Sequence, residues 1–199
     1  MKKISAYEIL LRQTQNVSLI WKDVHGIAPN NAASKLDIAM LDWQNELTKT
    51  LSIWIDKGLQ MTDGELILAR ANLGAIVESW LRFFYCVYYD DYVKNPMKTK
   101  RGKILEPEKD MRFEDLKNFS TGILWDDTKS KDYIRIDDIQ HKRNAIHSFT
   151  YKDIGTPIDF LLDVDFLCEF VNKLLNHLPP IEDMLDTYPD GYIFNVYCN

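Results

Sequence analysis

The sequence predicts an all-α protein, a bundle of about five main helices with short helices between them and mostly antiparallel neighbours. Three observations lead to this class. Apolar residues recur at spacings of three and four through most of the chain, as on the buried face of a helix. Capping boxes, a Ser or Thr followed three residues later by a Glu, precede two of these stretches. Only residues 193–197 have an extended pattern, and a single strand is not stable alone.

Length and composition suit one soluble domain, placed at residues 1–180, with a C-terminal extension at 181–199. The chain has 199 residues, of which 46% are hydrophobic and 27% charged, ordinary values for a globular protein. Cys86, Cys168 and Cys198 lie far apart without metal-ligand spacing, which favours a reducing, cytoplasmic location with no metal and no cofactor. The N-terminus does not resemble a secretory signal, and no apolar run approaches the roughly 18 residues of a membrane span.

The net charge of −6 disfavours a general nucleic-acid coat, because a polyanion is repelled at long range. It still permits RNA at a local basic site. The same negative charge disfavours an acidic antitoxin-like partner, because the two proteins would repel each other.

Two helices are expected before residue 60. A capping box formed by Ser5 and Glu8 predicts a helix from Ala6 to about His25, where Gly26 and a following proline stop it. A second helix is predicted from one apolar stripe over about five turns, with Gly58 as a left-handed cap. The stripe consists of Leu36, Met40, Trp43, Leu47, Leu51 and Trp54.

The longest helix is predicted from about Asp63 to about Val93, after a capping box of Thr62 and Glu65. Its far end is rich in tyrosine. This end is either ordinary core of a large bundle, the simpler interpretation, or a surface that packs against a partner. The tyrosines are Tyr85, Tyr88, Tyr89 and Tyr92.

Residues 94–109 form the main break, and their first half is basic in an otherwise acidic chain. Lys100 and Arg101 lie in the middle of this basic run. The run is either a phosphate-contacting loop, which makes these two residues candidate substrate-binding groups, or a solvated surface loop.

Three further helices are expected: a short one at Phe113–Leu124, one from about Lys131 to Phe149, and a last one after the cap Thr156, ending before two prolines at 179–180. The extension is expected to hold a short helix at Ile181–Asp186 and a turn at Pro189–Gly191.

The segment Gln140–Phe149 contains most of the side chains that could take part in catalysis. Arg143 and His147 are four apart, which on a helix puts them on one face, and Asn144 adds an amide. Arg143 interrupts an apolar stripe, so it must be paired or line a cleft. A guanidinium that holds a phosphate and an imidazole that moves a proton are what metal-independent cleavage of RNA requires. The alternative is a purely structural role, in which Arg143 pairs with a buried acid and His147 caps the end of the helix.

Arg143-Asn144-Ala145-Ile146-His147 resembles the signature of the HEPN family (higher eukaryotes and prokaryotes nucleotide-binding domains), an Arg, often a polar residue, and a His after four to six intervening residues. Here three residues intervene, and Lys142 would restore the spacing without supplying a guanidinium. The resemblance covers about residues 65–178. It implies a HEPN-like up-and-down helical bundle and a metal-independent endoribonuclease of the toxin or phage-defence type, in which two subunits pair their motifs across a homodimer interface.

Other interpretations remain open. Glu78 either pairs with Arg143 and fixes its orientation or makes a surface pair with Arg82 one turn on. Lys142 is a further candidate for substrate binding. A non-catalytic HEPN-like module that binds a nucleotide, an antitoxin or another protein fits the same shortened motif, and an enzyme of a small metabolite is the least supported candidate.

Overall fold

The structure is a computed structural model that describes residues 5–179. Within that range it is all-helical, as predicted, and contains no strand. The elements are α1 (Ala6–Trp21), α2 (Asn30–Asp37), α3 (Leu41–Lys57), η1 (Gly58–Gln60), α4 (Asp63–Val87), α5 (Tyr89–Tyr92), α6 (Phe113–Phe119), α7 (Lys131–Arg143), η2 (Asn144–His147) and α8 (Pro157–Asn176), where η marks a 3₁₀ turn.

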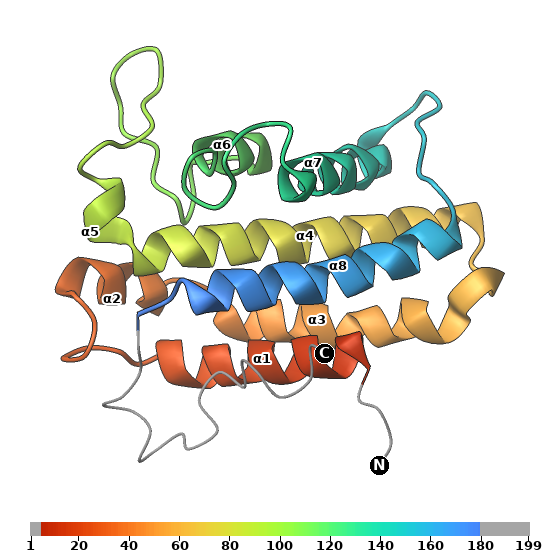
Figure 1. Ribbon diagram of the computed structural model, residues 1–199, viewed down its shortest axis with the longest axis horizontal. Helices are drawn as coiled ribbons and strands as arrows, with labels where there is room; N and C mark the ends of the chain where they lie inside the picture. Colours follow the sequence, from red (N-terminus) through yellow and green to blue (C-terminus); the bar gives the residue numbers. More distant parts are fainter. Residues whose placement is uncertain (1–4, 180–199) are drawn as a thin grey trace.

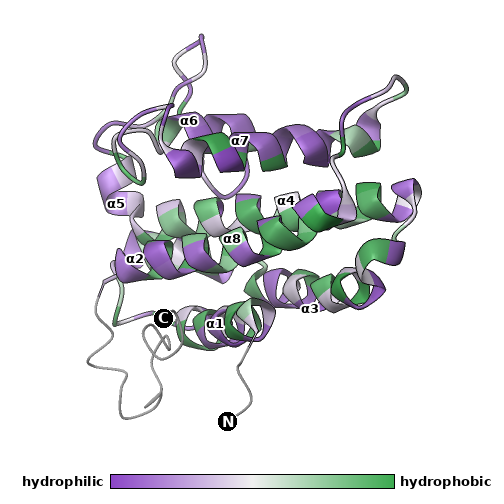
Figure 2. Cartoon of the chain, turned by 45° about the vertical axis from the view of Figure 1, so that its right-hand side comes forward, coloured by the Kyte–Doolittle hydropathy of each residue, from purple (hydrophilic) through white to green (hydrophobic). Residues whose placement is uncertain are grey.

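The helices are arranged around α4, the longest of them. Figure 1 shows α4 and α8 in the middle, with α6 and α7 on one side and α1 and α3 on the other. α4 packs against α3, α7 and α8, so it contributes to every layer of the bundle. Most of α7, on the outside, is hydrophilic (Figure 2).

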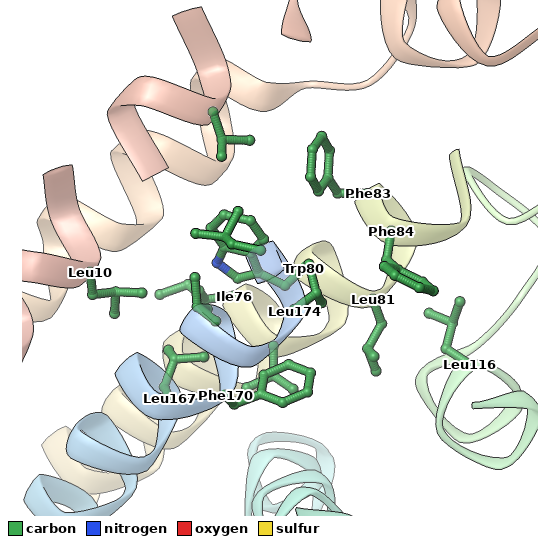
Figure 3. Close-up of a cluster of buried hydrophobic side chains, with 14 of the residues drawn as sticks. Leu10, Ile76, Trp80, Leu81, Phe83, Phe84, Leu116, Leu167, Phe170 and Leu174 are labelled. Carbon is green, nitrogen blue, oxygen red and sulfur yellow. The ribbon is translucent and has the colours of Figure 1, made fainter. Parts of the chain in front are cut away.

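The core follows from the apolar faces of these helices. Figure 3 shows Ile76 and Trp80 of α4 beside Leu167 and Leu174 of α8, with Leu10 of α1 close by. All five side chains are at most 1% exposed. A fully buried Leu or Ile side chain contributes about 1.5–3 kcal/mol to folding, so this shared cluster is the main force that holds the layers together.

The three helix starts that the sequence predicts from a capping Ser or Thr are confirmed. The side chains of Ser5, Thr62 and Thr156 each accept a hydrogen bond from the backbone of the third residue of the helix that follows. An acid at that third position reaches back to the cap in each case, which satisfies backbone N–H groups that a helix start leaves free.

The second predicted helix is wrong as a single element. The chain leaves the helix after Asp37 and starts a new one at Leu41, with Met40 outside helical geometry. Met40 and Trp43 of the predicted stripe are 54% and 66% exposed. Leu36 and Leu51 of the stripe are buried as predicted, and the buried face of α3 also carries Leu41, Gln44 and Thr48. Thr48 can be buried because its hydroxyl donates to the Gln44 carbonyl within the helix.

Other helices end earlier than predicted. α1 stops at Trp21, α4 at Val87 before the separate turn α5, α6 at Phe119, and α7 at Arg143. The predictions for residues 181–199 lie outside the described residues.

Candidate functional site around Arg143

Arg143, the last residue of α7, packs directly against a glycine of α4, Gly74. A Cβ atom placed on Gly74 would lie 2.4 Å from Cγ and 2.5 Å from Cβ of Arg143. These distances are far below the ordinary carbon–carbon separation of about 3.5–4.0 Å. Gly74 therefore lets the stem of Arg143 lie directly on the backbone of α4.

The Arg143 guanidinium is held from two sides. One of its terminal nitrogens donates to Glu78 of α4 over 3.0 Å, and the other donates to the Asn144 side-chain oxygen over 3.1 Å. The Arg143 side chain remains 30% exposed, whereas Glu78 is only 14% exposed. A charge that the sequence placed on an apolar stripe is thus paired and still partly open to solvent.

Glu78 makes both of the pairs that the sequence analysis treated as alternatives. Its second carboxylate oxygen accepts a hydrogen bond from Arg82 over 2.7 Å. Arg82 also donates to the backbone carbonyls of Pro107 and Met111. One carboxylate therefore links the motif arginine to the connection between α5 and α6.

His147 does not stack on Arg143 along a continuous helix, so that prediction is wrong. α7 ends at Arg143, and Asn144–His147 form a 3₁₀ turn in which the four-residue spacing no longer places side chains one above the other. His147 is exposed, and within residues 5–179 its ring makes no hydrogen bond or ion pair. Helix capping by His147 therefore finds no support.

The surface next to His147 is apolar. Ile146 is 42% exposed, and Phe149 and Tyr151 are almost fully exposed. Ala145, by contrast, is buried, which anchors the turn to the bundle. Three large apolar side chains on one short segment are uncommon on a free surface and mark a place where another molecule can bind.

Lys142, a candidate substrate-binding residue, forms an ion pair within its own helix. Its Nζ donates to Asp138 over 2.6 Å, and the Lys142 side chain is 12% exposed. It also lies near Asp159, whose pKa is lowered mainly by the hydrogen bonds from Thr156 and further by the charge of Lys142. Lys142 therefore supports the loop before α8 and presents little free charge to a ligand.

Lys100 and Arg101 lie at the tip of a hairpin-like turn that runs from Thr99 to Lys103. The Thr99 N–H donates to the Lys103 carbonyl over 2.8 Å, and Gly102 adopts the left-handed φ of 82° that the turn requires. In Figure 1 this loop projects at the end of the bundle near α5, and the chain after α7 lies at the other end. One subunit therefore does not bring these two cations to the motif.

Sequence reasoning missed a buried ion cluster behind the motif. Arg70 of α4 and Asp163 of α8 are fully buried and form an ion pair, and Arg135 of α7 pairs with the same carboxylate. Arg70 also donates to the Ile154 carbonyl over 3.0 Å, which ties down the loop after the motif. The sequence does contain a sign of this cluster. Arg70 is a charged residue within the apolar helix α4, and a buried charge must be paired.

Gly74 was missed as well, although a lone glycine inside a helical pattern commonly marks close packing. Arg70, Gly74, Glu78 and Arg82 recur every four residues along α4. Gly74 and Glu78 contact Arg143, and the other two contact the connections on either side of the motif helix. The site is therefore organised by one row of residues on the central helix.

The described residues, 5–179, contain no group of three or more His, Cys, Asp or Glu side chains placed to hold a metal ion. None of their helices is long and apolar enough to cross a membrane. Comparisons with protein-family models, with curated proteins and with solved structures found no match.

Proposed function

We propose that the chain is a divergent HEPN-like protein that cleaves RNA without a metal ion, at a composite site formed by two copies. Arg143 binds the scissile phosphate, His147 transfers the proton, and Asn144 orients the guanidinium. The attacking 2′-hydroxyl must lose a proton and the leaving oxygen must gain one. One motif supplies one imidazole, so the second comes most simply from a second subunit.

The observation that carries this proposal is the contrast between the two motif residues. Arg143 is fixed by Glu78 and remains 30% exposed, and His147 is exposed with no partner within residues 5–179. A positioned cation and an uncommitted imidazole, four residues apart in the chain, are the two kinds of group that phosphoryl chemistry uses. The exposed Ile146, Phe149 and Tyr151 beside His147 offer apolar surface for a homodimer.

Lys100 and Arg101 contact the RNA backbone away from the scissile phosphate in this proposal, and Lys142 acts through the loop it supports. The toxin or phage-defence setting follows from the resemblance in the motif, and the cytoplasmic location from the three widely spaced cysteines.

A second candidate is a non-catalytic HEPN-like module that binds a nucleotide, an antitoxin or another protein. The observation in its favour is that both terminal nitrogens of Arg143 already have partners, Glu78 and Asn144. A guanidinium engaged in this way has fewer donors left for two phosphate oxygens.

The deciding experiment is an RNA cleavage assay with a chelator present, on wild type and on His147→Ala. His141→Ala is the matched control, because the His141 side chain is 72% exposed and belongs to the same segment. We expect cleavage by wild type and by the control, and none by His147→Ala. Cleavage that survives in His147→Ala, or no cleavage by wild type, would refute the catalytic proposal and favour the binding module.

The composite site has its own test. Catalysis by two copies requires dimers at the concentration at which the protein is active, which sedimentation measures. Mixing wild type with an excess of His147→Ala should then reduce activity below the level that dilution explains, because mixed dimers lack one imidazole. An active monomer would refute the composite site.

A further inference from the structure

The end of the bundle away from His147 carries an apolar pocket of about 400 Å³. It is walled by the end of α4, by α5 and by α6, through Phe84, Tyr88, Phe119 and other aromatic rings. Ile123 at its rim is 48% exposed. Burial raises the pKa of Tyr92, one of the lining residues, to about 12. Pockets of this size and lining bind apolar groups.

The described chain ends beside this pocket. α8 stops at Asn176, and the Tyr88 hydroxyl donates to the backbone carbonyl of His177, which itself lines the pocket. Leu178 is 9% exposed, so the chain is still attached to the bundle one residue before Pro179. Residues 180–199 therefore start within a few residues of the pocket, and little chain entropy opposes their binding there.

The composition of residues 180–199 matches that surface. Nine of them are large and apolar or aromatic: Ile181, Met184, Leu185, Tyr188, Tyr192, Ile193, Phe194, Val196 and Tyr197. The segment also has four acids, Glu182, Asp183, Asp186 and Asp190, and no Lys or Arg.

The cations that complement these acids lie on the hairpin into which the chain continues from the pocket. Asn95 lines the pocket, and the chain continues from it into the hairpin. Lys98, Lys100 and Arg101 on that hairpin are exposed and make no ion pair among the described residues. Their neighbours Lys94 and Lys103 are paired with Asp91 and Asp110. The hairpin thus carries three exposed charges that are opposite in sign to the acids of residues 180–199.

We propose that residues 180–199 dock on their own bundle, with apolar side chains in the pocket walled by Phe84, Tyr88 and Phe119 and with acids facing the hairpin of Lys98, Lys100 and Arg101. The occupant is this chain's own C-terminal segment. The inference uses neither Arg143 nor His147. It shares Lys100 and Arg101 with the RNA-contacting role proposed above, for which the docked acids would compete with RNA.

Hydrogen exchange on the full chain tests the apolar part of the docking. We expect amides within residues 180–199 to exchange more slowly than in a free peptide of the same sequence. Ile123→Glu places a charge at the pocket rim, and it should speed exchange of this segment about tenfold or more, because burial of one apolar side chain is lost. Ile134→Glu is the matched control, since Ile134 on α7 is 55% exposed, lies outside the pocket and should leave the exchange unchanged.

Charge reversal tests the electrostatic part without touching the pocket. Lys100→Glu with Arg101→Glu should speed exchange of residues 180–199, and adding Asp183→Lys with Asp186→Lys should restore the protection. Wild-type protection should fall as salt is added, since exposed charges are screened.

Three results would overturn the proposal. One is exchange of residues 180–199 at the free-peptide rate in wild type. Another is protection that Ile123→Glu leaves intact, which would place the segment elsewhere. The third is protection that grows with protein concentration, which would make a second copy the occupant. Since none of these measurements involves RNA, their outcome is separate from that of the cleavage assay.

Discussion

Gly74→Ala sets two effects of similar size against each other. Alanine is the better helix former by about 0.8–1.0 kcal/mol, so propensity alone predicts a more stable protein. The added Cβ, however, would lie 2.4 Å from Cγ and 2.5 Å from Cβ of Arg143. Overpacking of this kind costs typically about 1–3 kcal/mol. The contacted atoms belong to the base of the side chain, which cannot swing away, so we expect the upper part of that range.

The expected net effect is a loss of about 1–2 kcal/mol, measured as a lower urea midpoint with an unchanged slope. For a chain of this length that corresponds to a melting temperature lower by about 2–8 °C. Because α7 must move, Arg143 should also shift from Glu78, and any RNA cleavage should fall with it.

Two comparisons make this reasoning refutable. Gly64→Ala is the matched control, since Gly64 lies in the same helix with no atom within 4 Å of a Cβ at that position, and it should be neutral or stabilising. Arg143→Ala should leave most of the Gly74→Ala penalty in place, because its Cβ remains, whereas Arg143→Gly should remove that penalty. A Gly74→Ala protein that is as stable as Gly64→Ala would show that the close approach does not constrain the helices.

Three further perturbations have defined outcomes. Glu78→Gln should lower the free energy of unfolding by about 1–3 kcal/mol, seen in urea unfolding, because two arginines lose their shared carboxylate. Asp163→Ala should cost about 3–5 kcal/mol by leaving a fully buried arginine unpaired, while the exposed Asp165→Ala stays within about 0.5 kcal/mol; equal losses would contradict the buried pair. Lys117 lowers the pKa of Glu114 from its ordinary value of 4.5, so that contribution to stability is present above this value and is lost as pH falls through the lowered pKa. Unfolding midpoints measured from about pH 6 to about pH 3 should therefore fall more steeply in wild type than in Lys117→Met, and parallel curves would refute the linkage.

The sequence predicted the all-helical class and the helix starts, because both depend on nearby residues. Ser5, Thr62 and Thr156 each cap a helix through a group three residues away, so these starts depend mainly on neighbouring residues. The breaks at Met40 and Tyr88 carry neither glycine nor proline. Packing between helices determines where such breaks occur, so they cannot be predicted from the neighbouring residues in the sequence.

The candidate site was predicted in part for the same reason. Arg143 and Asn144 do contact each other, as neighbours in the chain can. Arg143 and Glu78 are 65 positions apart in the chain. The sequence therefore left two possible partners for Glu78, Arg143 and Arg82, without deciding between them. The end of α7 at Arg143 separated the two motif side chains that a continuous helix would have stacked.

The row formed by Arg70, Gly74, Glu78 and Arg82 does not run straight along α4. An α-helix has about 3.6 residues per turn, so each step of four residues turns the direction of the side chain by roughly 40°. The row therefore winds around the central helix and faces α8 first, then α7, then the connection before α6. A rotation of α4 about its own axis would disturb all three neighbours together, so the orientation of the motif arginine is coupled to both ends of the molecule.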